Sequence, residues 1–242
     1  MQDKRVIITG GSSGIGLACC QLFLDSGYEV FNLSRRPAPI ESALLRSVAV
    51  DLTDALATRE VALSLAREFP ATTLVHCAGA IRERPIADVA LADLTALTNL
   101  HLAAALSLLQ ANLAAMKAAR FGRIVLVSSR AILGLAHRSA YASTKAGLLG
   151  LARTWSLELA THGVTVNVVA PGPIAETEMF HDIIPAASPK IETVIKAVPV
   201  GRLGTPQDVA RAILFFASPQ SSFITGQTLF VCGGTSVGSI AY

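Results

Sequence analysis

The chain has little charge and no local concentration of it. Only 15% of its 242 residues are charged, whereas 52% are hydrophobic, and an average soluble domain carries roughly 25% charged residues. Such a composition suits a large core, with further surface buried between subunits. The net charge of +3 is spread over scattered arginines without a basic block, which argues against a nucleic-acid partner.

Cysteine is scarce, and its spacing excludes two uses. The four cysteines show no metal-ligand spacing, and the adjacent residues Cys19 and Cys20 are poor disulfide partners. We therefore expect reduced thiols, no metal site and a cytoplasmic protein. The first residues, MQDKRVIITGG, run from charge directly into a predicted strand, which is not the pattern of a signal peptide.

One segment lacks acidic and basic residues altogether. Residues 94–116 contain no Asp, Glu, Lys or Arg and are long enough to cross a bilayer. The segment nevertheless holds seven polar residues, namely Thr95, Thr98, Asn99, His101, Ser107, Gln110 and Asn112. We therefore predict a soluble protein without a membrane partner, in which this helix is buried between a sheet and a neighbouring subunit.

Short apolar, β-branched runs alternate with helical patterns from end to end. The predicted strands are residues 5–9, 29–33, 47–50, 72–76, 123–127, 164–169 and 228–231, and the predicted helices are 14–26, 54–68, 88–119, 139–162 and 206–217. Continuous apolar strands are buried on both faces, so we predict an α/β fold. It is one doubly wound Rossmann domain, 1–242, with about seven parallel strands. The long irregular stretch 171–204 is the predicted substrate loop.

A glycine-rich turn, TGGSSGIG at residues 9–16, follows the first predicted strand and opens a helix. Glycines allow the backbone to approach a pyrophosphate, and the helix N-terminus offers free N–H groups with a partial positive charge. The spacing alone also fits a simple tight turn, but its place between strand and helix is the context that nucleotide binding requires. The predicted cofactor contacts are Gly10, Ser12, Ser13, Gly14, Ile15 and Gly16.

Tyr141 and Lys145 stand one helical turn apart, shortly after a predicted strand that ends in Ser128 and Ser129. A free tyrosine has a pKa of about 10 and is a poor acid or base near neutrality. A neighbouring ammonium, together with a cationic cofactor ring, is expected to lower the tyrosine pKa by about two to three units, or ~3–4 kcal/mol. The pattern therefore predicts a tyrosine that transfers a proton.

Five motifs occur together in one order. They are the glycine spacing G-x-x-x-G-x-G, HCAG at 76–79, Tyr141-x-x-x-Lys145, Pro171-Gly172 and CGG at 232–234. In this combination the chain resembles the short-chain dehydrogenase/reductase family, and within it the 3-oxoacyl carrier-protein reductases, over essentially all 242 residues. The resemblance implies that Tyr141 protonates a developing alkoxide, that Lys145 bonds the nicotinamide ribose and that a serine holds the substrate oxygen.

The resemblance leaves that serine open between two neighbours. Aligned on the strand GRIVLVSS it is Ser129, which we prefer, whereas the usual interval to the tyrosine gives Ser128. Asp51 resembles an adenine-contacting residue, and it fits a capping turn ahead of Thr53 almost as well. The further cofactor contacts that the resemblance implies are Asp51, Leu52, Cys77, Ala78, Gly79, Tyr141, Lys145, Pro171, Gly172, Ile174 and Thr177.

The residues at the end of the second predicted strand determine whether the site favours NAD or NADP. An NAD enzyme needs an acid there for the ribose 2′-hydroxyl, and that acid would repel a 2′-phosphate. This chain has Ser34, followed by Arg35 and Arg36, and arginine suits a phosphate in charge and in geometry. Although an arginine pair on a loop is usually just solvated, at this position it predicts NADP(H).

Three positions depart from the family pattern. Cys77 replaces an asparagine that braces the central strands, and Cys232 replaces an aspartate, which we interpret as structural. His101 stands where the family has an asparagine that is thought to hold a water and relay protons to the lysine. Asn99, two residues earlier, lies roughly 200° around the helix and cannot face the same way. Either His101 therefore substitutes for the asparagine through a ring nitrogen, or the relay is absent.

We predict an NADP(H)-dependent oxidoreductase that reduces a ketone or 3-oxoacyl carbonyl to a hydroxyl. Apolar residues in the 171–204 loop suggest a small-molecule substrate with hydrophobic bulk, while Arg130 and Arg138 either attract an acidic group or are solvated. The resemblance also implies a homotetramer, formed through helix 94–116 and the helix that carries Tyr141. The alternatives are an oxidative alcohol or sugar dehydrogenase and a non-catalytic NADPH-sensing protein.

Overall fold

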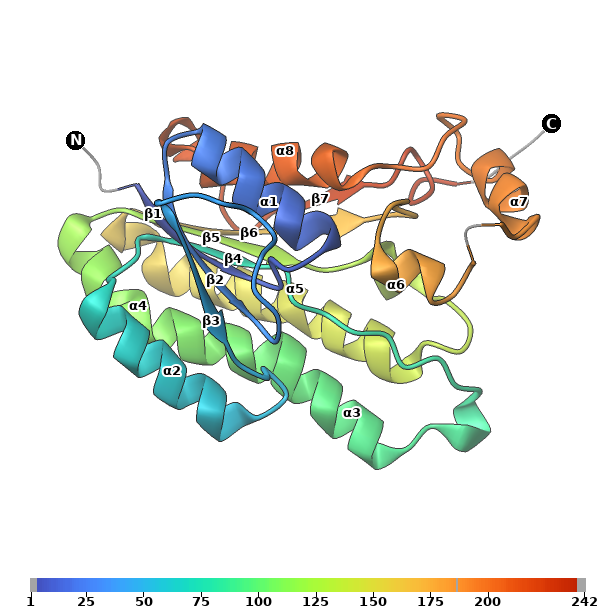
Figure 1. Ribbon diagram of the computed structural model, residues 1–242, viewed down its shortest axis with the longest axis horizontal. Coiled ribbons are helices and arrows are strands. Elements are labelled where there is room, and N and C mark those ends of the chain that lie inside the picture. The colour runs from blue at the N-terminus through green and yellow to red at the C-terminus, as the bar shows by residue number, and fades with distance from the viewer. Residues whose placement is uncertain (1–3, 186, 239–242) are drawn as a thin grey trace.

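The computed structural model describes residues 4–185 and 187–238. Seven parallel strands form one sheet in the order β3-β2-β1-β4-β5-β6-β7 (Figure 1). Their bounds are Arg5–Thr9 (β1), Glu29–Ser34 (β2), Leu45–Ala49 (β3), Thr73–His76 (β4), Gly122–Val127 (β5), Val164–Pro171 (β6) and Thr228–Val231 (β7). The predicted doubly wound parallel sheet is confirmed.

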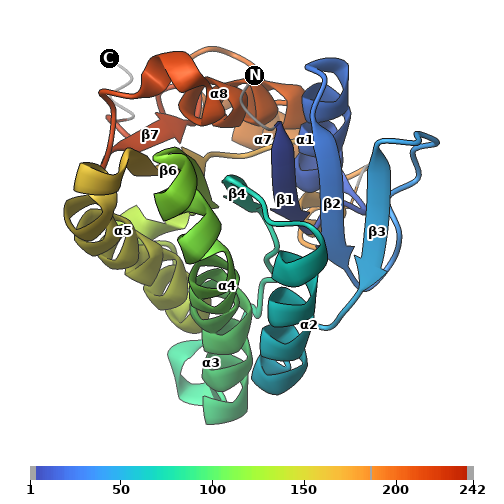
Figure 2. The ribbon, with the colours of Figure 1, turned by 90° about the vertical axis from the view of Figure 1, so that its left-hand side faces the viewer.

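Helices cover both faces of this sheet. α1 (Gly14–Asp25) and α8 (Pro206–Ala217) pack together on one face, whereas α2 (Ala55–Glu68), α4 (Ala104–Ala119) and α5 (Ser139–Leu159) cover the other (Figure 2). Each face closes its own cluster of buried apolar side chains. Every position of β6, VTVNVVAP, is buried, which is why its sequence reads as a continuous apolar run rather than an alternating one.

The long apolar helix is less regular than predicted. In place of one helix over 88–119, the structure has a 3₁₀ turn η1 (Ile86–Asp88), α3 (Leu91–Thr98), a π-helical turn η2 (Asn99–Ala103) and α4. By length and composition Leu91–Ala119 could cross a bilayer, a property that core helices of soluble proteins share. Its buried Asn112 accepts a hydrogen bond from Ala71 N at 3.0 Å, which favours packing within the protein.

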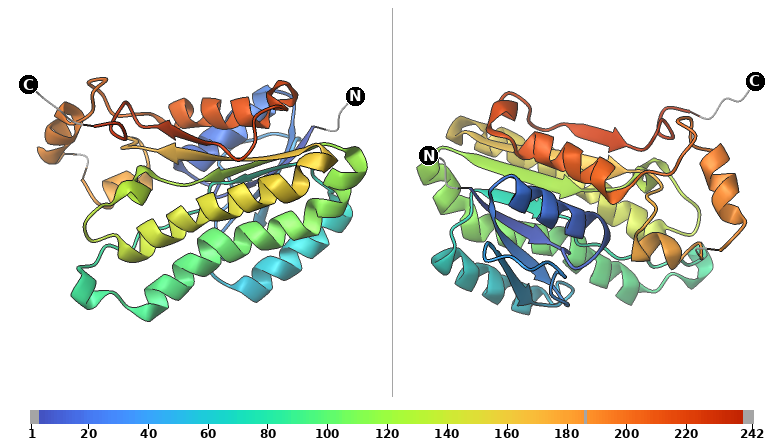
Figure 3. Two further views of the ribbon diagram at one scale, coloured as in Figure 1. Left: turned by 180° about the vertical axis from the view of Figure 1, so that it is seen from behind. Right: turned by 45° about the horizontal axis from the view of Figure 1, so that its top comes forward.

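The strand order reverses at β1, since β2 and β3 lie on one side of it and β4 to β7 on the other. The carboxyl ends of strands at such a switch point form a ligand-binding crevice. The 171–204 segment, with α6 (Glu178–His181) and α7 (Lys190–Lys196), projects beyond one end of the sheet (Figure 3). Its ends are tied together, because Ala175 N donates to Gly204 O at 2.9 Å and Gly204 N to Pro173 O at 3.0 Å.

Candidate active site

The glycine-rich turn lies at the switch point, between β1 and α1. Gly11 N donates to Asn32 Oδ1 at 2.8 Å, which ties the turn to β2, and a Cβ on Gly16 would collide with the Gly10 carbonyl. Within the described residues, Ser13 makes no side-chain capping bond and the first turn of α1 has no acid. The N–H groups at the start of α1 are therefore open to an anion. The half-buried residues around this opening include Ser12, Ser13, Gly14 and Ile15.

The end of β2 presents the two arginines. Ser34 is buried, and its hydroxyl donates to the Arg36 carbonyl, so it supports the turn from beneath rather than facing a ligand. Arg35 and Arg36 are exposed. Arg36 is nevertheless engaged, because its Nη2 lies 2.8 and 2.7 Å from the two carboxylate oxygens of Glu178 at the start of α6.

Asp51 and Leu52 follow β3. One carboxylate oxygen of Asp51 accepts hydrogen bonds from the Thr53 backbone N–H at 2.9 Å and hydroxyl at 2.8 Å, and these bonds lower the pKa of Asp51. The N-cap of α2 itself is Asp54. Asp51 thus forms the turn ahead of Thr53 that was the alternative to an adenine contact, while its side chain stays exposed. Leu52 is buried in the core.

The end of β4 is braced without the family's asparagine. Thr9 Oγ1 lies 3.0 Å from His76 Nδ1 and accepts a bond from Ala78 N at 3.0 Å, which joins β1 to β4. The Cys77 side chain hydrogen-bonds the thiol of Cys19 on α1, and this bond together with burial raises the pKa of Cys19. A polar link and a thiol contact therefore replace the amide at this position.

Helix α5 carries Tyr141 and Lys145 into the interior, where they are 6% and 2% exposed. Lys145 Nζ lies 5.9 Å from the centre of the Tyr141 ring and donates to the Val127 carbonyl at 2.8 Å. Ser129 makes a side-chain hydrogen bond with Tyr141, whereas the buried Ser128 donates to the Lys145 carbonyl at 2.8 Å. Of the two serines, Ser129 is the one beside the tyrosine hydroxyl.

Burial dominates the titration of this pair. It raises the pKa of Tyr141, although the Ser129 hydrogen bond and the Arg138 charge act in the opposite direction. It also lowers the pKa of Lys145 to about 8. For the chain by itself the pKa of Tyr141 is therefore raised, because desolvation disfavours the charged form. The predicted lowering depends on the cationic cofactor ring as well as on Lys145, so it stays a prediction. At neutral pH Tyr141 keeps its proton, which is the form that can act as an acid.

His101 approaches Lys145 from the π-helical turn. A Cβ on Gly79 would lie 3.2 Å from Lys145 Nζ and 3.3 Å from His101 Nε2, so the two nitrogens face one spot. His101 Nδ1 lies 2.9 Å from Thr144 Oγ1, whose single hydrogen is donated to the Ala140 carbonyl at 2.9 Å. Nδ1 therefore donates and Nε2 is an acceptor, and among the described residues Nε2 has no hydrogen-bond partner.

The surroundings of His101 keep its ring neutral. Burial and the nearby Lys145 charge lower the pKa of His101 far below its ordinary value. A buried acceptor without a partner costs free energy, so such an atom calls for a water or ligand that bonds it. Asn99 does not share this position, since its side chain donates to the Thr53 carbonyl at 2.9 Å.

The 171–204 segment contains the remaining predicted contacts. Pro171 ends β6, and Gly172 N donates to Val231 O on β7 at 2.9 Å. Ile174 is buried in the core cluster beneath α8, so it anchors the segment instead of lining an open lid. Thr177 is the N-cap of α6 and lies against the glycine-rich turn. There its methyl carbon would be 3.1 Å from a Cβ on Gly14.

The two arginines beside the catalytic stretch are held by the protein. Arg138 is neither solvated nor open to a ligand, because its side chain is 6% exposed and forms an ion pair with Glu83 at 2.9 Å. Arg130 Nη1 lies 3.4 Å from the Thr235 carbonyl. Sequence reasoning missed the acidic partners Glu83 and Glu178, since exposed charges show no periodicity that reveals contacts between distant segments.

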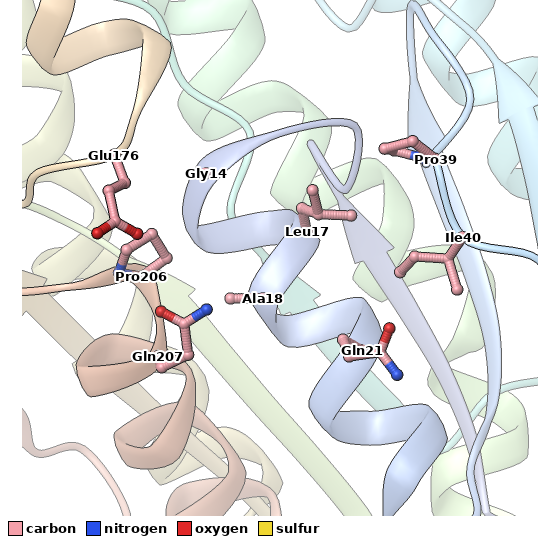
Figure 4. Close-up of a pocket in the computed structure, with 9 residues that line it drawn as sticks. All are labelled: Gly14, Leu17, Ala18, Gln21, Pro39, Ile40, Glu176, Pro206 and Gln207. Carbon is pink, nitrogen blue, oxygen red and sulfur yellow. The ribbon is translucent and has the colours of Figure 1, made fainter.

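A hollow beside α1 continues from the glycine-rich turn (Figure 4). Gly14 borders it, together with Leu17 and Gln21 on α1, Ile40 after β2 and Glu176 in the 171–204 segment. Tyr141, Lys145 and His101 are not among the residues that line it. The hollow therefore adjoins the predicted pyrophosphate end and not the buried cluster.

A glycine-rich turn at the switch point, together with a half-buried serine and a buried tyrosine and lysine, defines the site of a dinucleotide-dependent oxidoreductase. The family model described as enoyl-(acyl carrier protein) reductase matches residues 10–236. The chain belongs to the short-chain dehydrogenase/reductase family, as its motifs indicated, and is similar to its 3-oxoacyl carrier-protein reductases.

Relatives with several activities match the chain. It is 33% identical to the 3-oxoacyl-[acyl-carrier-protein] reductase FabG of Thermotoga maritima, with 97% of this chain and 98% of the relative covered. It is 40% identical to subunit BbsC of (2S)-[(R)-hydroxy(phenyl)methyl]succinyl-CoA dehydrogenase of Thauera aromatica, over 81% of this chain and 76% of the relative.

A solved structure from Beutenbergia cavernae also matches the fold. It is described as a candidate NAD(P)-dependent gluconate 5-dehydrogenase with NADP bound at low occupancy. The match has a TM-score of 0.90 at 31% identity and covers 97% of both chains. The comparisons therefore agree on the oxidoreductase family while their names differ in substrate.

Proposed function

We propose that the protein is an NADP(H)-dependent reductase that converts a ketone or 3-oxoacyl carbonyl to a hydroxyl. The observation that carries this proposal is the half-buried Ser129 together with the buried Tyr141 and Lys145, with burial keeping Tyr141 protonated. A protein that only sensed NADPH would have no need of this group. The similarity to an acyl-carrier-protein reductase supports the substrate class.

The residues fit a phosphorylated nicotinamide dinucleotide. The open N-terminus of α1, with Ser13 and Gly14, would hold the pyrophosphate, and Arg35 and Arg36 would hold the 2′-phosphate. Lys145 would bond the nicotinamide ribose. The bound cofactor supplies the hydride. Seven other predicted contacts that are half-buried or exposed would border this path, namely Ser12, Ile15, Asp51, Cys77, Gly79, Gly172 and Thr177.

The chain's own residues supply the proton and the orientation. Ser129 would donate a hydrogen bond to the substrate oxygen, and Tyr141 Oη would give that oxygen its proton. Lys145 stands behind Tyr141, and His101 Nε2 faces the same spot as the lysine nitrogen. A water bonded there would satisfy the orphaned Nε2 and connect it to Lys145, so His101 would be a positioning residue for proton return.

The 171–204 segment supports a substrate with apolar bulk. Met179, Phe180 and Ile184 are half-buried in α6 and just after it, and Ile183 is 37% exposed. For the assembly, we propose a homotetramer formed through α4 and α5. Exposed apolar side chains on the two helices, among them Leu106 and Leu157, are consistent with it. A cytoplasmic location completes the proposal.

The function is tested by NADPH consumption with a panel of 3-oxoacyl thioesters, diketones and cyclic ketones. We expect turnover with at least one class, and faster turnover with NADPH than with NADH. Oxidation of alcohols or sugars alone would favour the dehydrogenase alternative. Tight NADPH binding without turnover of any compound in either direction would refute the enzymatic proposal.

A further inference from the structure

The arginine that would select NADP is already occupied by a carboxylate of the same chain. Arg36 Nη2 contacts both oxygens of Glu178, at 2.8 and 2.7 Å, although the two residues are 142 positions apart. Their side chains are 61% and 59% exposed. The contact joins the turn after β2 to the first residue of α6.

Glu178 is aimed at Arg36 by a fixed start of its helix. Thr177 Oγ1 accepts a hydrogen bond from Phe180 N at 3.1 Å and donates to the Ile174 carbonyl at 3.2 Å. The methyl carbon of Thr177 lies against Gly14 of the glycine-rich turn, and Ile174 is buried. The preceding residues therefore hold the Glu178 backbone beside the cofactor path.

We propose that Glu178 is a specificity-determining residue that competes with the 2′-phosphate of NADP(H) for Arg36. This inference rests on the proposed function, because it needs a dinucleotide in this site. Both oxygens of Glu178 contact Nη2 of Arg36, and a phosphate bound in bidentate fashion needs that nitrogen as one of its two donors. The carboxylate must therefore leave when such a phosphate binds. NADP(H) has to displace Glu178, whereas NAD(H) leaves the ion pair intact.

The competition lowers the preference of the protein for NADP(H) over NAD(H) by a modest factor, so removing Glu178 should increase that preference. An exposed ion pair contributes up to about 1 kcal/mol, so its loss changes an equilibrium by about fivefold at most. Because the pair is exposed, the exchange is easy and reversible. Glu178 therefore reduces the advantage of NADP(H) over NAD(H) without abolishing it.

The test compares Glu178→Gln with Glu60→Gln, a variant that removes the same charge from α2, away from the cofactor path. Glu60 is exposed and has no ion pair among the described residues. Isothermal titration with NADPH and NADH should show about three- to fivefold tighter NADPH binding for Glu178→Gln. NADH binding should stay unchanged, and Glu60→Gln should bind both nucleotides as the parent does.

A double-mutant cycle identifies the partner. Arg36→Ala should weaken NADPH binding, and adding Glu178→Gln to it should produce no tightening. Equal tightening by both glutamate variants, or tightening that persists without Arg36, would overturn the inference and indicate a general charge effect. Unchanged NADPH affinity in Glu178→Gln would overturn it while the proposed function stands. A parent protein that binds neither nucleotide would overturn both.

Discussion

The two ends of the proposed cofactor path hold their charged groups in different ways. At the inner end, Tyr141, Lys145 and His101 are all less than a tenth exposed, and burial decides which of them carry a proton. At the rim, Arg36 and Glu178 are more than half exposed, and within the part of the chain that the structure describes their side chains form an ion pair with each other alone. The interior therefore fixes the chemistry, whereas the rim leaves the choice of ligand adjustable at small free-energy cost.

Removing the buried phenol should have the largest effect. Tyr141→Phe deletes the group that would give its proton to the substrate oxygen, and general acid catalysis contributes about 10²–10⁴-fold. We expect turnover, measured as NADPH consumption, to fall by about 10³-fold. Tyr28→Phe is the matched control, because Tyr28 is equally buried, packs on Phe23 and lies in the other core cluster. Comparable loss in both variants would point to a folding defect.

The two serines at the end of β5 should differ in their effects on turnover and on stability. Ser129→Ala removes the hydroxyl beside Tyr141, and losing one such donor lowers turnover by about 10²-fold. Ser128→Ala instead removes the hydrogen bond to the Lys145 carbonyl, which should lower the free energy of unfolding by about 1 kcal/mol with little change in turnover. Reversed effects on turnover would transfer the proposed role to Ser128.

More of the structure at the buried end than at the rim could be predicted from the sequence. The predicted bounds of β1 and β7 are those observed. For β1 the reason is that an apolar run buried on both faces has few other solutions, whereas β7 is a partly buried edge strand. The π turn at His101 was missed, since α- and π-helical stretches of apolar residues look alike in sequence. The choice between Ser128 and Ser129 also needed coordinates, because it depends on which side of the strand each hydroxyl faces.

At the rim, the sequence indicated the arginines but not what they contact. Arg36 and Glu178 are far apart in the chain, and neither belongs to a periodic pattern. The effect of burial on the pKa of Tyr141 could not be predicted for a related reason. The charges of Lys145 and of the cofactor could be inferred from the sequence, whereas the desolvation that raises this pKa in the chain by itself arises from many packed residues.

His101 should make the buried end sensitive to acid. Its pKa is lowered in the folded state, so below about pH 6.5 the unfolded chain binds more protons and stability falls as pH falls. At pH 5 this histidine alone should cost about 2 kcal/mol of the free energy of unfolding. Lys145, His76 and Tyr141 face it, and His76, with a pKa of about 3, adds an effect of the same sign.

The measurement is urea unfolding at pH 7 and pH 5. His101→Asn should lose about 2 kcal/mol less than the parent between these two pH values. The control residue His162 lies in the 3₁₀ turn η4 (Ala160–His162), which has no buried residue. His162→Asn should lose as much stability between the two pH values as the parent does. Identical acid sensitivity of parent and His101→Asn would show that the ring is not held neutral by burial.

Turnover should fall in His101→Ala, and unchanged turnover would remove His101 from the proposed mechanism.

The smallest expected effects are changes in the free energy of unfolding when two ion pairs are broken, one with a buried arginine and one that is exposed. Glu83→Gln leaves the guanidinium of Arg138, 6% exposed, without its partner. Uncompensated burial of a charge is destabilising, but Glu83 itself is 49% exposed, so we expect a loss of about 1 kcal/mol in the free energy of unfolding. Glu192→Gln breaks a pair with Lys196 in which both side chains are 73% exposed. It should change stability by less than about 0.5 kcal/mol. If thermal unfolding showed equal losses for the two variants, burial would not be what distinguishes the interior charges from those at the surface.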